Sequence, residues 1–391
     1  MQNVCRIPDA KLKLMNYPIN SDVGTEVAIY ILLNMKDKTV LIGAIDTANP
    51  PCRIDQNEAA RLVEIHYGSV LKQRSMELLK QALRHPSIES RYFSIDNKED
   101  IVVLKDEDPD KRVQRFTRWA VELSVAAVKK ALRRAGVAAE DVSAIIVNTC
   151  TGYLCPGIAT YCLEPLGLRP GTLAFDLVGS GCGGAIANLM MGAGLLDRKA
   201  RGVVVCVSVE ICTATFQMGD DPSLLISNAI FGDGAAAAVL WREPQGYRLC
   251  ASASRFFPNH RDEVRFIYKK GQLHNRITAR LPDIICRFVP VFIRDFLGEQ
   301  GLTPERIGSW ALHPGGDKMI VGLKRELSLS DTQLAQTRSV LKEFGNMSSP
   351  TVLFILERIM QESANAENGG WCLACAYGAG LSMHACLLQR T

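Results

Sequence analysis

Two segments of the chain repeat the same order of structural signals, and this internal repeat restricts the fold more than any other feature. The segment GVAAEDVSAIIVNTCTG, residues 136–152, aligns without a gap on GLTPERIGSWALHPGG, residues 301–316. Each runs from a helix-ending glycine through a short loop and a buried strand to a polar strand tip. We therefore predict two related α/β halves, residues 39–249 and 250–391, preceded by an N-terminal extension of unknown role at residues 1–38.

Strands and helices alternate through the first half. The clearest helix covers residues 117–135 and ends at Gly136, and a second helix is expected at 182–197. Apolar strand-like runs occur around them at residues 143–149, 173–179 and 202–209. This alternation predicts a mainly parallel sheet with helices on both faces. Active sites of such sheets lie at the carboxyl ends of strands, where the repeat sets Asn148 opposite His313.

Composition excludes several classes of protein. With 391 residues, 47% hydrophobic and 22% charged, the chain can bury a large core. A net charge of +4 and the lack of a basic, aromatic-rich run argue against a nucleic-acid partner. The sequence has no apolar stretch of the ~18 residues that span a membrane, and the charges and proline near its start differ from a signal peptide. A cytoplasmic location is expected.

The thirteen cysteines are scattered through apolar segments, so most are interpreted as small buried hydrophobes rather than disulfide partners. The pair Cys372 and Cys375 forms a CxxC, but no second pair or suitably spaced histidine accompanies it. We therefore read it as a strand interior and predict no metal site.

Cys182 differs from the other cysteines because it lies among four glycines in GSGCGGAI, residues 179–186. It follows a strand and opens a helix, so unpaired N–H groups and the helix dipole should lower its pKa and favour a nucleophilic thiolate. The alternative is a cysteine packed where the glycines leave little room.

His313 and Asn346 complete a candidate catalytic set. His313 leaves an apolar strand into the turn PGG, and it could pair with the thiolate or be a satisfied core histidine. Asn346, in GNMSSPT, could donate an N–H to an oxyanion or cap the following helix. A Cys-His-Asn set also occurs in papain-like hydrolases, but here all three residues lie at the ends of elements in a duplicated α/β sheet.

Eight segments, in order and spacing, make the chain from about Thr39 onward resemble the type III polyketide synthases, the chalcone synthase-like group of the thiolase superfamily. The segments are TANPP, SRYF, the PG of TGYLCPG, GCGG, VEICTATF, FGDGAAAA, HPGG and GNMSSPTVLF. The resemblance implies a duplicated thiolase-like fold of five αβαβα layers and a homodimer. It also implies iterative decarboxylative condensation of malonyl-CoA onto an acyl starter thioester, with coenzyme A thioesters as substrates and no cofactor.

The resemblance also assigns roles to residues. Cys182 would accept the acyl group, while His313 and Asn346 would bind the thioester carbonyl and stabilise the enolate left by decarboxylation. Phe231 would form the junction of tunnel and chamber, or else be an ordinary core aromatic. The remaining chamber positions would shape the product rather than perform the chemistry; they are Cys150, Thr151, Cys155, Cys212, Thr215 and Ser348.

Several departures from plant members indicate a bacterial-type enzyme with a longer cavity suited to an alkyl or fatty acyl starter, giving a pyrone, resorcinol or related product. Cys150 and Cys212 replace threonines, RITARLP lacks an aromatic gatekeeper, and CAYGAGL differs from the usual GFGPGL. The coenzyme A positions carry Leu78, Gln81 and His85, which leaves an acyl carrier protein open as the starter's donor. A single-round ketoacyl synthase, a thioester hydrolase and a non-catalytic acyl-binding protein are the alternatives.

Overall fold

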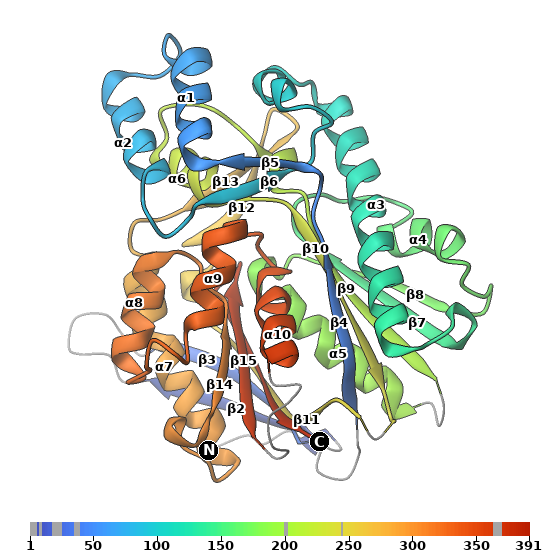
Figure 1. Cartoon of the computed structure of the whole chain (residues 1–391). Coiled ribbons are helices and arrows are strands. Elements are labelled where there is room, and N and C mark those ends of the chain that lie inside the picture. The colour runs from blue at the N-terminus through green and yellow to red at the C-terminus, as the bar shows by residue number, and fades with distance from the viewer. Residues whose placement is uncertain are drawn as a thin grey trace.

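A branched sheet runs through the molecule and carries most of its elements (Figure 1). The computed structural model of the chain describes residues 6–7, 10–17, 26–34, 40–198, 202–243, 245–362 and 370–391. Within these residues the sheet has twelve strands, with β14, β15 and β16 branching from β11. The strands of the first half are β4 (Leu41–Ala48), β10 (Gly234–Trp241), β9 (Val203–Glu210), β7 (Val142–Thr149) and β8 (Leu173–Val178). Those of the second half are β11 (Tyr247–Phe256), β16 (Ser382–Arg390), β15 (Trp371–Gly378) and β14 (Ser309–Leu312).

Helices cover both halves and fill the space between them. An outer layer packs on the first half through one apolar cluster and consists of α3 (Pro109–Ala135) and α4 (Ile158–Leu166). A central layer contacts both halves and consists of α5 (Gly184–Arg198) and α10 (Thr351–Glu362). The opposite outer layer consists of α7 (Leu281–Glu299) and α8 (Asp317–Glu326). The α/β fold therefore has the αβαβα order that the resemblance implied.

Strand direction differs from the prediction. A mainly parallel sheet was expected, but β10 pairs antiparallel with both β4 and β9, and β16 pairs antiparallel with both β11 and β15. Among the described strands, parallel pairs are limited to β7–β8, β7–β9 and β14–β15. The turn between β15 and β16 is too short for a crossover, so these strands must be antiparallel. Because both faces of the sheet are covered, apolar runs alone do not reveal strand direction.

The long helix α3 shows how local sequence sets an element's ends. It begins at Pro109, earlier than predicted, because the Asp108 carboxylate accepts a hydrogen bond from the Lys111 N–H at 2.9 Å. It ends at Gly136, whose φ of 66° lies in the left-handed region that glycine adopts readily.

The predicted N-terminal extension contributes strands to the same sheet. These are β1 (Arg6–Ile7), β2 (Ala10–Tyr17) and β3 (Glu26–Asn34), and β3 pairs with β11. The rest of residues 1–38 lies outside the described residues, and the extension's role stays unassigned.

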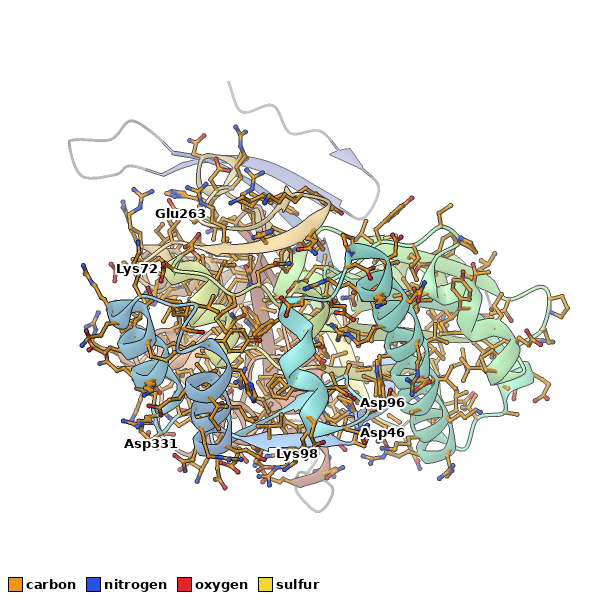
Figure 2. All side chains as sticks on the ribbon, turned by 90° about the horizontal axis from the view of Figure 1, so that it is seen from above. Asp46, Lys72, Asp96, Lys98, Glu263 and Asp331 are labelled. Atoms are coloured by element: carbon orange, nitrogen blue, oxygen red, sulfur yellow. The ribbon has the colours of Figure 1, made fainter. Side chains whose placement is uncertain are left out.

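Smaller elements lie over the carboxyl ends of the central strands. The helices are α1 (Gln56–Tyr67), α2 (Gln73–Leu83), α6 (Pro222–Ile230) and α9 (Ala335–Phe344). Two small antiparallel sheets of two strands accompany them, β5 (Cys52–Asp55) with β6 (Ser90–Phe93) and β12 (Val264–Lys269) with β13 (Gln272–Ile277). Charged side chains such as Asp96 and Lys98, labelled in Figure 2, are exposed, and Lys98 pairs with Glu58 at 3.0 Å. Within the described residues, no helix combines the length and apolarity needed to cross a membrane.

Candidate active site

Cys182 lies in a tight turn between β8 and α5, formed by the 3-10 segment η3 (Gly181–Gly183). Gly181 has a φ of 54°, and a Cβ there would come within 2.7 Å of the Ala379 N. A Cβ on Gly183 would come within 2.6 Å of the His384 ring. The glycines around Cys182 are therefore needed because β15 and β16 pass directly behind the turn.

The loop between α9 and α10 brings a hydroxyl to the cysteine and carries a buried amide two residues away. Ser348 Oγ lies 3.3 Å from Sγ of Cys182 and 3.5 Å from Sγ of Cys150. Asn346, two residues earlier, is buried, and its Oδ1 accepts a hydrogen bond from the Ser348 N–H at 2.7 Å. Its Nδ2 makes only a long contact of 3.5 Å to the Gly315 carbonyl, so this N–H group can still donate to a ligand.

His313 follows β14 directly, as the repeat predicts. Its backbone N–H donates to the Cys375 carbonyl at 2.9 Å, and its imidazole is 1% exposed. The ring meets the Tyr377 ring edge-on, with centroids 5.5 Å apart. Burial lowers the pKa of His313 to about 3, so the imidazole is neutral at physiological pH.

The three segments that carry Cys182, His313 and Asn346 share neighbours. Tyr377 contacts the His313 ring, and a Cβ on the next residue, Gly378, would lie 2.8 Å from the Cys182 N. On the other side, the Asn346 amide reaches the His313 turn at the Gly315 carbonyl. The fold thus brings the Cys182 turn to two segments that lie more than a hundred residues later in the sequence.

The structure corrects the prediction that Cys182 is a thiolate at rest. Burial raises the pKa of the Cys182 thiol to about 12, although the Ser348 hydroxyl partly offsets this. The cost of removing an anion from water is the largest influence on this thiol. With His313 neutral as well, neither side chain carries a charge at rest, which differs from the predicted pairing of an imidazole with a thiolate.

Sequence reasoning missed Glu210, which holds the site together at the end of β9. This buried carboxylate accepts hydrogen bonds from the N–H groups of Cys150 at 2.9 Å and Thr151 at 3.1 Å. It also accepts from the hydroxyls of Thr149, Thr151 and Ser349, at 3.1, 2.8 and 2.6 Å. Its signal in the sequence is a single charge closing the apolar run VVVCVSVE.

Asn148, which the repeat sets opposite His313, supports the same loop rather than facing a cavity. Its Nδ2 donates to Ser349 Oγ at 2.9 Å, and its Oδ1 accepts from Ser208 and Asn188 at 2.6 and 3.1 Å. Such a satisfied buried network rigidifies its surroundings. The two halves therefore use equivalent strand tips differently.

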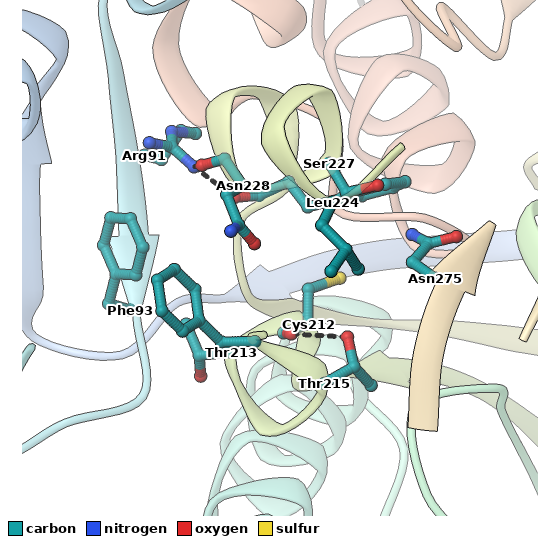
Figure 3. A pocket seen from close by; sticks show the side chains of 11 residues that line it. Arg91, Phe93, Cys212, Thr213, Thr215, Leu224, Ser227, Asn228 and Asn275 are labelled. Atoms are coloured by element: carbon teal, nitrogen blue, oxygen red, sulfur yellow. Dashed lines mark hydrogen bonds between the residues drawn. The ribbon is translucent and has the colours of Figure 1, made fainter. Parts of the chain in front are cut away.

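The other predicted chamber residues divide into three groups. Cys212, Thr215 and Phe231 line one pocket together with Arg91 and Phe93 (Figure 3). Cys150 and Ser348 lie beside Cys182, whereas the Thr151 hydroxyl is turned to Glu210. Cys155 is exposed, unlike the buried or half-buried residues of the other two groups. The backbone links this pocket to the Asn346 loop, because the Gly232 N–H donates to the Asn346 carbonyl at 3.0 Å.

Comparisons with known proteins identify the family. A family model described as FAE1/Type III polyketide synthase-like protein matches residues 52–252, and the model for the C-terminal domain of chalcone and stilbene synthases matches residues 248–391. The alpha-pyrone synthesis polyketide synthase-like Pks18 of Mycobacterium tuberculosis is 27% identical over 89% of this chain and 91% of its own. The 1,3,6,8-tetrahydroxynaphthalene synthase of Streptomyces peucetius is 26% identical over 90% of this chain and 94% of its own.

Solved structures agree on the fold. The polyketide synthase PKS-I of the brown alga Ectocarpus siliculosus superposes with a TM-score of 0.83 at 24% identity, covering 90% of this chain and 98% of that one. The tetrahydroxynaphthalene synthase of Streptomyces coelicolor gives 0.82 at 22%, covering 90% and 99%. The match of both family models across nearly the whole length means that this chain belongs to the type III polyketide synthases, which are condensing enzymes of the acyltransferase class.

Proposed function

We propose that this synthase loads an acyl starter onto Cys182 and extends it with several malonyl units from malonyl-CoA before ring closure. The observation that carries the proposal is the contact of Cys182 with the loop of Asn346 and Ser348, beside a neutral His313. These groups supply one nucleophile and two N–H donors, which is what decarboxylative condensation needs. We propose no cofactor, because decarboxylation itself generates the carbanion.

Loading is a thiol exchange. The Cys182 sulfur attacks the starter's carbonyl, the C–S bond to the donor breaks, and the thiol proton ends on the departing sulfur. A raised thiol pKa is compatible with this step because no lasting thiolate is required, and Ser348 Oγ, 3.3 Å from the sulfur, can accept the thiol's hydrogen bond during the exchange.

Extension begins with loss of carbon dioxide from malonyl thioester. The electrons of the breaking C–C bond form an enolate, whose oxygen would accept hydrogen bonds from His313 and Asn346. The enolate carbon then attacks the carbonyl of the acyl group on Cys182, the C–S bond breaks, and the departing Cys182 sulfur takes a proton from water. The lengthened chain is left as a thioester on the malonyl donor, ready to be loaded again. Burial keeps His313 neutral, so it acts as a hydrogen-bond donor rather than as a charged acid.

The starter and the ring closure are proposed more broadly. We propose an alkyl or fatty acyl starter and a pyrone, resorcinol or related ring, because the pocket lined by Cys212 and Phe231 also carries the apolar side chains of Phe93, Phe216 and Leu224. Of the basic residues on and before α2, Lys80 pairs with Glu64 at 2.6 Å and Lys72 with Asp220 at 3.8 Å. This surface is consistent with delivery of the starter either by coenzyme A or by an acyl carrier protein. We expect the reaction to take place in the cytoplasm.

We also propose a homodimer. The edge strand β8 exposes three large apolar side chains, with Leu173 at 37%, Phe175 at 44% and Val178 at 54%. An unpaired edge of this kind is normally covered. Cys155 lies near it, because Gly157 packs against Asp176 of β8, so this predicted site residue would lie near the interface.

Mass spectrometry of the products tests the function directly. The purified enzyme is incubated with a panel of acyl-CoA starters, with and without malonyl-CoA, alongside Cys182→Ala. We expect products that carry two or more malonyl units, made only by the native enzyme. Products with one unit would favour a ketoacyl synthase, and release of free acid without malonyl-CoA would favour a thioester hydrolase.

A further inference from the structure

Beside the candidate site, two buried polar atoms of the described residues have no hydrogen-bond partner. Among the described residues, neither Nδ1 of His313 nor the hydroxyl of Tyr377 has a hydrogen-bond partner. Both side chains are nearly inaccessible, at 1% and 5% exposed. Buried polar groups are almost always hydrogen-bonded, so two orphans in contacting residues call for a common explanation.

Tyr377 is placed where it can interact with His313. The two rings meet at 81° with their centroids 5.5 Å apart. The tyrosine hydroxyl lies against Gly315, where a Cβ would come within 3.2 Å of it, and Gly315 is only two residues beyond His313. Tyr377 also precedes Gly378, which packs on the Cys182 turn. The tip of β15 therefore touches both the turn of the nucleophile and the turn of the histidine.

The chemistry of the two groups is complementary. Burial raises the pKa of Tyr377 well above its ordinary range, so the phenol keeps its proton and can donate. A neutral imidazole carries one N–H, and the partner of one nitrogen decides which nitrogen holds it. Because Nδ1 is sealed in the interior, Nε2 is the nitrogen that can face a substrate.

We propose that Tyr377 is a positioning residue whose hydroxyl donates to Nδ1 of His313, after a small ring rotation or through one buried water, and thereby keeps the proton on Nε2. This inference rests on the proposed role of His313, since an N–H on Nε2 is what an enolate oxygen requires. It deepens that role by naming the group that sets the tautomer.

Tyr377→Phe removes the hydroxyl and keeps the ring. The matched control is Tyr247→Phe, which removes the hydroxyl of a buried tyrosine on β11. Protein labelled with ¹⁵N in its six histidines is compared by NMR with the native enzyme, with His313→Gln identifying the signal. Decarboxylation of malonyl-CoA is measured alongside, and thermal melting shows that each variant folds.

In the native enzyme we expect the signal of an Nε2–H tautomer. In Tyr377→Phe we expect a mixture of tautomers and a kcat about fivefold lower at unchanged KM, the size typical of one lost hydrogen bond, while Tyr247→Phe changes neither. An unchanged His313 tautomer in Tyr377→Phe overturns the inference. A changed tautomer with unchanged decarboxylation instead overturns the proposed role of His313 and leaves its contact with Tyr377 standing.

Discussion

Removing the Glu210 carboxylate should both destabilise the protein and displace the loop that carries Asn346 and Ser348. In Glu210→Ala, the backbone N–H groups of Cys150 and Thr151 lose their acceptor, whereas the freed hydroxyls of Thr149 and Thr151 are 3.3 Å apart and can bond to each other. Two buried orphan donors cost about 1–3 kcal/mol each, or about 2–6 kcal/mol in all. For 391 residues the unfolding entropy is about 0.8 kcal/mol per kelvin, so Tm should fall by about 2–7 °C.

Glu210→Gln is the matched control, because an amide oxygen can accept the same backbone bonds. Burial raises the pKa of Glu210, so the folded protein holds the carboxyl proton more tightly than the unfolded chain does. Above the unfolded pKa of about 4.3, rising pH removes this proton at a cost to the folded state. The native enzyme should therefore lose stability relative to Glu210→Gln as pH rises from about 5 to 8.

Differential scanning calorimetry across this pH range measures both effects, and malonyl-CoA decarboxylation reports on the loop. We expect Glu210→Ala to lose activity as well, because Ser349 and its neighbours lose their anchor. Equal Tm values for Glu210→Ala and the native enzyme would refute the assignment of Glu210 as the anchor. A native enzyme that gains stability relative to Glu210→Gln as pH rises would refute the sign of the pKa argument.

Three further predictions follow from the site and the sheet edge. Asn346→Ala should slow malonyl decarboxylation about 10²–10³-fold in single-turnover assays while slowing starter loading less than tenfold; equal losses would contradict a donor role. Iodoacetamide should label Cys182 slowly at pH 8, where a thiol of pKa about 12 is only about 10⁻⁴ thiolate, and the labelling rate should rise about tenfold per pH unit. Mass spectrometry measures the labelling, and a rate that reaches a plateau below pH 8 would show an ionised thiol. Val178→Lys on β8 should convert a dimer to a monomer in analytical ultracentrifugation, whereas Val321→Lys, equally exposed on α8, should not; a dimer that survives Val178→Lys rules out this edge as the interface.

Comparison with the sequence shows which signals are local. The glycines around Cys182, the stop of α3 at Gly136 and the strand that leads to His313 are recognisable because each depends on the backbone preferences of a few neighbouring residues. The repeat of residues 136–152 in 301–316 likewise indicated two halves, since buried strands and their tips leave a readable pattern.

The direction of the strands, the protonation of the site residues and the hydrogen bonds that anchor them depend on partners that are distant in the chain. The antiparallel pairing of β16, the burial that makes Cys182 a thiol, and the five bonds of Glu210 all arise from contacts across the folded core. Desolvation depends on every atom that excludes water from a group, and no short segment contains that information. The sequence thus determined which residues are candidates for the chemistry, whereas the tertiary structure decided their charge and what holds them in place.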